Sequence, residues 1–327
     1  MNNMPRLVES QAPLGWGGAA RRPCRPPWPA VVSPATGDRT VPAHFGVVVL
    51  TQGKRPPDLS RALDSLLAQH DVVLDVVVVG NGWQPRGLPS GIRAHGLPEN
   101  LGIPAGRNAG VPLVTGDLLF FLDDDASLPD GDVLSRMAAQ FAADPLLGLI
   151  QPRVVDPDGQ PSPRRWTPRL RVGDTRRSSP AMSVWEGGVA MRREAFDYTG
   201  GWPAPFWYAH EGIDLAWRVW DGGFHVRYDG EIDVHHPAIQ PTRHGEFYRF
   251  QARNRVWLAR RNLPIPVGLA YVLAWVVVGG LRLRSRTAVV ETAKGYLLGV
   301  TQPCGERRPI SWQTVWRMTR AGHPPII

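Results

Sequence analysis

The sequence predicts an α/β fold: a Rossmann-like, mostly parallel sheet flanked by helices, followed by a C-terminal helical, membrane-associating extension. Three observations lead to this prediction. Apolar runs long enough for buried strands recur at 45–51, 72–79 and 118–122. Leucines at helical spacing fill the segment between the first two runs. Near the end of the 327-residue chain, residues 263–281 contain no charge.

Composition narrows the function classes. With 43% hydrophobic residues, the chain is large enough for one sizeable domain with an appendage. A net charge of +8 favours anionic partners such as nucleotide phosphates, nucleic acid or an acidic membrane surface. Cys24 and Cys304 have no metal or redox spacing, which excludes a disulfide framework and fits a reducing compartment.

Residues 1–42 are expected to form a disordered tail. They are rich in Pro, Gly and Arg, and the run at 21–29 cannot sustain a helix or a central strand. No apolar segment of the signal-peptide type is found there.

The first two strands and the helix between them predict a right-handed parallel crossover. Ligands of such sheets collect beyond the carboxyl ends of the strands. Thr51 and Asn81 stand at two of these ends, and the acidic triplet 123–125 follows the third strand. We therefore expect these side chains to line one crevice.

The triplet Asp123, Asp124 and Asp125 favours a cation site, because adjacent carboxylates repel one another and hard divalent ions take oxygen ligands. Alternate side chains of a strand share a face, so Asp123 and Asp125 can point the same way. The alternative is a solvated acidic turn.

The stretch 99–110 contains three glycines, which let the backbone turn sharply or approach a ligand. Arg107 and Asn108 begin a short helical stretch that faces the crevice. A plain loop with a helix cap is the alternative.

The second half continues with a helix marked by Val133, Met137 and Phe141, and a strand at 146–155. Residues 156–180 are rich in Pro and Arg and predict a mobile loop over the cleft.

Two more polar features follow. Glu211 begins a predicted helix and Asp214 comes three residues later, so both carboxylates share a helix face. The simpler interpretation is that they stabilise the helix N-terminus. A strand at 226–234 then ends in His235 and His236, one of which is a candidate metal ligand.

The order of these motifs resembles the family 2 glycosyltransferases. The resemblance covers roughly residues 45–263 and rests on the strand ends at Thr51 and Asn81, the Asn-Leu-Gly stretch before Arg107, and the acidic triplet. It implies a GT-A fold and an inverting enzyme that uses a nucleotide-sugar donor.

The resemblance also implies residue roles. Asp123 and Asp125 match the family's Asp-x-Asp element, which implies Mg²⁺ or Mn²⁺ on the donor diphosphate, with His236, or else His235, completing the site. Asn81 stands where the family often has the Asp that holds the base. The implied donor-binding residues are Thr51, Asn81, Asn100, Gly102, Arg107 and Asp124.

The expected catalytic base is Glu211, with Asp214 as the alternative. Family members commonly carry Glu-Asp, one further residue, and then Asp-Leu. Here Gly212 replaces the Asp of the first pair.

The implied organisation is a nucleotide-sugar-binding half at 43–150, an acceptor-binding half at 151–248 and a helical region at 249–327. We expect a UDP, dTDP or GDP sugar donor and a glycan or lipid-linked acceptor of the cell envelope, with no nucleic acid. The alternatives are a sugar nucleotidyltransferase and a non-catalytic basic module that binds membrane or nucleic acid.

The C-terminal region is expected to associate with the membrane. Residues 263–281 are near the lower limit for a spanning helix, and arginines stand on both sides. A helix or hairpin lying in the inner-leaflet interface is preferred, with a core helix or a true span as alternatives. The expected location is cytoplasmic, at the inner face of the membrane.

Overall fold

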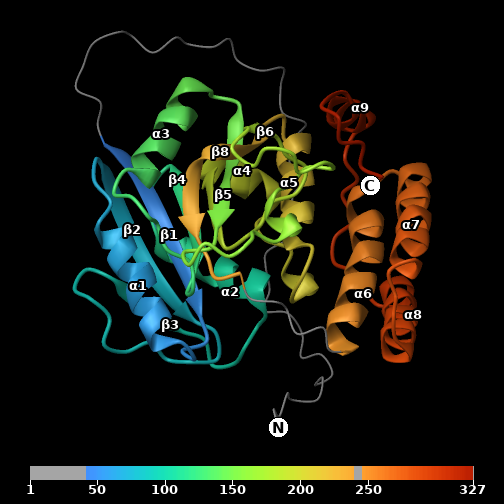
Figure 1. The fold of residues 1–327 in the computed structure, drawn as a ribbon, viewed down its shortest axis with the longest axis horizontal. Coiled ribbons are helices and arrows are strands. Elements are labelled where there is room, and N and C mark those ends of the chain that lie inside the picture. Colours follow the sequence, from blue (N-terminus) through green and yellow to red (C-terminus); the bar gives the residue numbers. More distant parts are fainter. Residues whose placement is uncertain (1–41, 239–244, 327) are drawn as a thin grey trace. The chain divides into compact units, whose positions relative to one another are not determined.

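The computed structural model describes residues 42–238 and 245–326, so the predicted tail at 1–42 lies outside them except for Pro42. Their centre is an eight-stranded mixed sheet in the order β3-β2-β1-β4-β7-β5-β8-β6 (Figure 1). The strands are β1 Ala43–Thr51, β2 Val72–Gly80, β3 Arg93–Gly96, β4 Leu118–Asp123, β5 Leu147–Val155, β6 Ser179–Pro180, β7 Gly188–Arg192 and β8 His225–His235.

The sheet gathers several strand ends at one edge. β1 pairs in parallel with β2 and β4, which sets Thr51 beside Gly80, and Leu50 beside Asp123. β5 and β8 are also parallel and finish together, with Val155 beside His235. The carboxyl ends of neighbouring parallel strands therefore meet where the sequence predicts the crevice.

β7 runs antiparallel between β4 and β5, so its start lies beside the end of β4. Leu122 pairs with Gly188, and the Asp123 N–H donates to the Gly187 carbonyl at 2.9 Å. The residues just before β7 are thereby brought to the acidic triplet.

Helices cover both faces of the sheet (Figure 1). Phe45, Val47 and Val49 of β1 pack in one buried cluster with residues of α1 and α3, whereas Val48 and Leu50 pack in another with residues of α4 and α5. This alternation is the period-two pattern of a strand buried on both sides. The helices of this part are α1 Pro56–Leu67, α2 Ile103–Gly110, α3 Val133–Ala143, α4 Arg193–Thr199 and α5 Glu211–Asp221.

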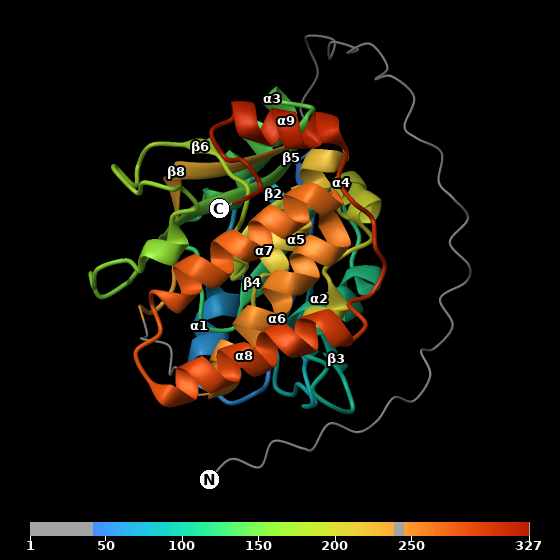
Figure 2. The same ribbon diagram turned by 90° about the vertical axis from the view of Figure 1, so that its right-hand side faces the viewer.

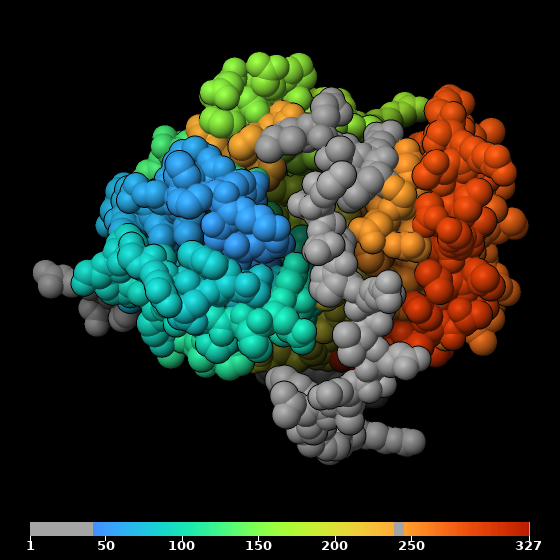
Figure 3. Space-filling view, turned by 90° about the horizontal axis from the view of Figure 1, so that it is seen from below, coloured from blue at the N-terminus to red at the C-terminus, as the bar shows by residue number. Residues whose placement is uncertain are grey.

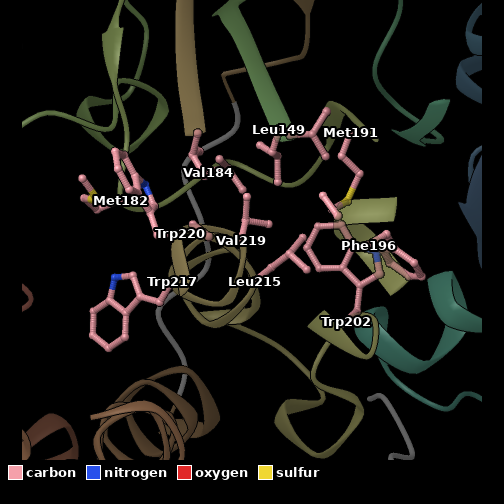
Figure 4. Packing of buried hydrophobic residues seen from close by; sticks show 14 of the residues in the cluster. Leu149, Met182, Val184, Met191, Phe196, Trp202, Leu215, Trp217, Val219 and Trp220 are labelled. Carbon is pink, nitrogen blue, oxygen red and sulfur yellow. The ribbon is translucent and has the colours of Figure 1, made fainter. Parts of the chain in front are cut away.

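The helix α5 is held firmly against the sheet (Figure 4). Leu215 and Val219 belong to the same buried cluster as Leu149 of β5 and Met191 of β7. The first turn of α5, which carries Glu211, is thus fixed relative to the strands.

Four helices complete the described chain, and Figure 2 shows α6, α7 and α8 packed side by side. They are α6 Gly245–Asn262, α7 Ile265–Gly280, α8 Arg286–Thr301 and α9 Trp312–Arg320. Within residues 42–238 and 245–326, every helix is too short or too polar to cross a membrane. The predicted α/β fold with a C-terminal helical region is confirmed. The predicted domain boundaries remain predictions.

Candidate active site

The acidic triplet at the end of β4 is surrounded by charged and polar groups, with Asp124 and Asp125 buried. Thr51 donates its hydroxyl to Asp124 at 2.6 Å. The Arg55 guanidinium, on the loop after β1, pairs with both Asp124 and Asp125. The Arg55 cation therefore offsets the repulsion between the two carboxylates. A bound metal ion would supply positive charge at the same place.

Asp123, Asp125 and His236 form a candidate metal centre. One ligand atom from each lies within 4.8 Å of the others. His236 presents Nε2 at 3.2 Å from Asp125 Oδ1, while its Nδ1 lies 2.8 Å from the Pro237 carbonyl. A hydrogen on Nδ1 leaves Nε2 free to bind a metal ion, and a carbonyl behind the ring is the usual outer support of a ligating histidine.

The electrostatics of this centre suit a cation. Burial lowers the pKa of His236, but the Asp125 carboxylate outweighs burial and the net pKa is raised. For Asp125, burial raises the pKa, but His236 and Arg55 outweigh it and the carboxyl stays ionised. His235, the other candidate histidine, lies outside this group of three and pairs through its backbone with Ser127.

Arg107 is a buried cation with spare donors. Its Nη2 donates to Asp123 at 2.7 Å, and the guanidinium lies 5.0 Å from the centre of the Trp202 ring. Its Nε and Nη1 are buried without a hydrogen-bond partner among the described residues. Unpaired buried donors are costly, so this guanidinium is suited to an anionic ligand in the crevice.

Three predicted donor-binding residues build the turn before α2. The Asn81 amide donates to the Gly102 carbonyl at 3.0 Å, and its oxygen accepts from the Leu101 N–H at 2.8 Å. Asn100 accepts from the Gly102 N–H at 2.9 Å. Gly102 has a φ of 82° and its backbone packs against Trp207. These side chains hold the crevice wall in place.

The loop before α5 is strained. Trp207, Ala209 and His210 have φ values of 65°, 71° and 70°, a region that non-glycine residues rarely adopt. The Asn254 amide, from α6, donates to the carbonyls of residues 206, 208 and 209 at 3.1, 2.7 and 2.9 Å. Such strain persists only when the surroundings enforce it, and it often marks a functional site.

This loop delivers Glu211, whose side chain is buried. Glu211 is 3% exposed, and its Oε2 has no hydrogen-bond partner in the described part of the chain. Burial, and then repulsion from Glu186, raise the pKa of Glu211 to about 8. Arg107 and Asp123 also act on it electrostatically, so its carboxyl lies near the candidate metal centre. A carboxyl of this pKa is matched to proton transfer near neutral pH.

Asp214 lies in a different environment. Its Oδ1 accepts from Arg261 at 2.9 Å and from Asn262 at 2.6 Å, and its Oδ2 lies 3.0 Å from Arg218. Asp214 is fully buried in this network, which ties α5 to α6. The two acids share a helix but point to different neighbours, and the geometry favours Glu211 as the base.

The loop 156–180, predicted to be mobile, is anchored at its middle. Trp166 is buried, and its ring lies 5.6 Å from the His236 ring, while Trp185 lies 4.9 Å from it. The two indole rings pack against the candidate metal ligand His236. Light green residues of this loop stand out from the surface in Figure 3.

Sequence reasoning missed Arg55, Glu186 and Asn254. Glu186 accepts from the Gly212 N–H at 2.8 Å, and burial raises its pKa. A single acid before two glycines, or an asparagine inside a helix, carries no local signal of function. Only strand pairing and helix packing bring them to the site.

Comparison with known proteins shows which family part of the chain is similar to. Residues 47–200 match the family model described as glycosyl transferase family 2. The pre-mycofactocin glycosyltransferase of Mycobacterium tuberculosis is 28% identical over 174 residues, which cover 50% of this chain and 33% of that protein. The chain's match thus spans about a third of the length of its curated relatives.

Solved structures share the fold. S. aureus TarS 1–349 has a TM-score of 0.55 at 14% identity, covering 79% of this chain and 81% of that one. GalNAc-T7 with UDP, GalNAc and Mn²⁺ has a TM-score of 0.58 at 13% identity, covering 87% and 58%. The mannosyltransferase PcManGT from Pyrobaculum calidifontis, with GDP-Man and Mn²⁺, has a TM-score of 0.50 at 20% identity, covering 79% and 81%. The predicted resemblance and the GT-A fold are confirmed.

Proposed function

We propose that this chain, which carries a family 2 glycosyltransferase domain, moves a sugar from a nucleoside-diphosphate sugar to an acceptor hydroxyl with inversion at the anomeric carbon. The observation that carries the proposal is the meeting of Asp123, Asp125 and His236 within 4.8 Å. The buried, partly unpaired Arg107 and Glu211 lie in electrostatic contact with this centre.

The residues fit a divalent cation, since two carboxylates and one imidazole supply ligand atoms of the types that Mn²⁺ accepts, and Mg²⁺ through its oxygens. A bound ion would stabilise the charge that develops on the leaving diphosphate. The spare Nε and Nη1 donors of Arg107 bind diphosphate oxygens beside it. That neighbours with this fold are solved with UDP or GDP-Man and Mn²⁺ supports the same arrangement here.

Glu211 removes the proton from the acceptor hydroxyl as that oxygen attacks the anomeric carbon. The bond to the diphosphate breaks on the opposite side, so one displacement inverts configuration and no protein nucleophile is needed. Burial of Glu211 keeps it a strong enough base for a hydroxyl. Asp124, bonded to Thr51 and Arg55, keeps the floor of the donor site rigid.

A donor screen tests this function. Purified protein is incubated with UDP, dTDP and GDP sugars and Mn²⁺ or Mg²⁺, and the released nucleotide is identified. We expect metal-dependent release of nucleoside diphosphate that Asp125→Ala abolishes. Release of pyrophosphate would indicate a nucleotidyltransferase instead, and the absence of any calorimetric binding of these nucleotides with Mn²⁺ would indicate a non-catalytic module.

We further propose that α7 and α8 bind an anionic membrane surface, where a lipid-linked or cell-envelope glycan acceptor is met. On α7, Ile265, Leu269 and Leu273 recur every four residues and are 69%, 69% and 68% exposed. Exposed valines and leucines continue on α8. Both helices are seen at one side of Figure 3.

The charge beside this apolar face supports an anionic membrane as its binding partner. Arg282, Arg284 and Arg286 are exposed in and around the turn between α7 and α8. An apolar face edged by arginines suits the interface of an anionic leaflet.

Vesicle co-sedimentation tests whether α7 and α8 bind an anionic membrane. We expect binding to phosphatidylglycerol vesicles, weakened by about 100-fold or more in Leu269→Glu/Leu273→Glu, because each buried leucine contributes about 2 kcal/mol. Leu67→Glu, at a half-exposed leucine on α1, is the matched control. Equal binding by the double variant, or equal binding to phosphatidylcholine vesicles, would refute the proposal.

A further inference from the structure

Glu186 is a carboxylate beside the site that the proposed mechanism does not yet use. It lies two residues before β7, next to Gly187, whose carbonyl accepts from the Asp123 N–H at 2.9 Å. The antiparallel pairing of β7 with β4 therefore carries Glu186 to the edge of the crevice.

Its carboxylate binds the start of α5. Glu186 Oε1 accepts from the Gly212 N–H at 2.8 Å, in the first turn of the helix. This N–H is one of the backbone donors that a helix leaves unpaired at its N-terminus, where negative charge is stabilised.

Gly212 leaves room for that contact. A Cβ at position 212 would stand 2.5 Å from Glu186 Oε1 and 2.3 Å from the Val184 carbonyl oxygen. Any side chain there would displace both groups. The family's usual Asp is thus excluded from position 212, and the carboxylate of Glu186, from the segment before β7, takes up the space.

Glu211 directly precedes Gly212, and several charged or polar groups act on its buried carboxyl. Glu186 from the segment before β7, Arg107 from α2, Asp123 from β4 and Tyr208 from the preceding loop all act on it electrostatically. Its Oε2 has no hydrogen-bond partner among the described residues.

We propose that Glu186 is a positioning residue for Glu211: it fixes the first turn of α5 so that Glu211 Oε2 stays available to the acceptor, and it supplies the second carboxylate that position 212 lacks. This inference rests on the proposed function of Glu211 as the base.

The arrangement has a titration consequence. Two neighbouring carboxyls resist holding two negative charges, and this repulsion adds to burial in raising the pKa of Glu211. Burial, and then Glu186, raise the pKa of Glu211 to about 8. Removing the Glu186 charge lowers the pKa of Glu211, and the base becomes active at lower pH.

Glu186→Gln tests the proposal, because the Gln oxygen still accepts from the Gly212 N–H while the charge is lost. We expect the acidic limb of the kcat profile to move down by about one pH unit. Glu186→Ala, which also removes the acceptor, should lower kcat about tenfold further. Glu231→Gln, at an exposed acid on β8, is the matched control and should leave the limb unchanged.

A direct titration separates this inference from the proposed function. The ¹³C carboxyl signal of Glu211, assigned with Glu211→Gln, is followed against pH in the wild type and in Glu186→Gln. A midpoint that falls in the variant supports the inference whether or not a donor has been found. An unmoved midpoint, or an activity that survives Glu211→Gln but not Glu186→Gln, overturns it. Failure of the donor screen overturns the proposed function alone.

Discussion

Asp214→Asn is predicted to destabilise the fold strongly rather than to remove a catalytic group. Asp214 is fully buried, and Arg218 and Arg261, which are 5% and 6% exposed, are paired with it. Neutralising the carboxylate leaves two buried cations without their counter-charge. Breaking a buried ion pair in this way costs about 3–5 kcal/mol.

Equilibrium urea unfolding followed by circular dichroism measures this loss. We expect the free energy of unfolding to fall by about 3–5 kcal/mol with an unchanged m-value. Asp58→Asn is the matched control, because its ion pair with Arg61 lies at the surface and should contribute about 1 kcal/mol or less. A variant that keeps wild-type stability but loses turnover would refute the reasoning and make Asp214 the base.

Three further predictions concern the site. Glu211→Gln should keep donor and metal binding but lose turnover. The stability of the wild type should fall as pH rises from about 4.5 to about 8, because the buried Glu211 stays protonated in the folded state while it ionises in the unfolded state. Glu211→Gln lacks this ionisation, so its stability should rise relative to the wild type across that window, which unfolding at pH 5 and pH 8 measures. Asn254→Ala should lower kcat at least about tenfold with a smaller change in KM, because three carbonyls of the strained loop lose their donor; equal kcat in steady-state assays would contradict this role. Gly110→Ala should destabilise the fold by about 1–3 kcal/mol in urea unfolding, since the new Cβ would stand 2.6 Å from Val48 Cγ1; a stabilised variant would show that α2 can move away.

The parts of the site that follow strand ends were predictable from sequence. Asp123 and Asp125 come directly after a buried apolar run, and His236 directly follows β8. In a parallel arrangement such ends share an edge, so the candidate metal centre follows from local patterns combined with one rule of topology.

The positions of Glu186 and Asn254 at the site could not be predicted from local patterns. Glu186 meets Gly212 only because β7 runs antiparallel between β4 and β5, and Asn254 meets residues 206–209 only because α6 packs on α5. Neither contact produces a periodic pattern in the sequence.

Two residue interpretations changed for physical reasons. Gly106 and Gly110 let α2 approach β1 closely, with Leu50 and Val48 where their side chains would lie, so in the described structure they serve packing. Helical spacing put Glu211 and Asp214 on one face, but Arg261 and Asn262 of α6 donate to Asp214, which is thereby engaged in packing α6 on α5.

Manganese binding tests the central claim most directly. Mn²⁺ is titrated into wild-type protein with and without UDP or GDP, and the free ion is followed by electron paramagnetic resonance. We expect saturable Mn²⁺ binding that becomes tighter when the nucleotide is present. Asp125→Asn and His236→Ala should each weaken Mn²⁺ binding by at least about tenfold, while Glu231→Gln should bind Mn²⁺ like the wild type. Equal Mn²⁺ affinity in Asp125→Asn, His236→Ala and the wild type would contradict a metal centre at these residues.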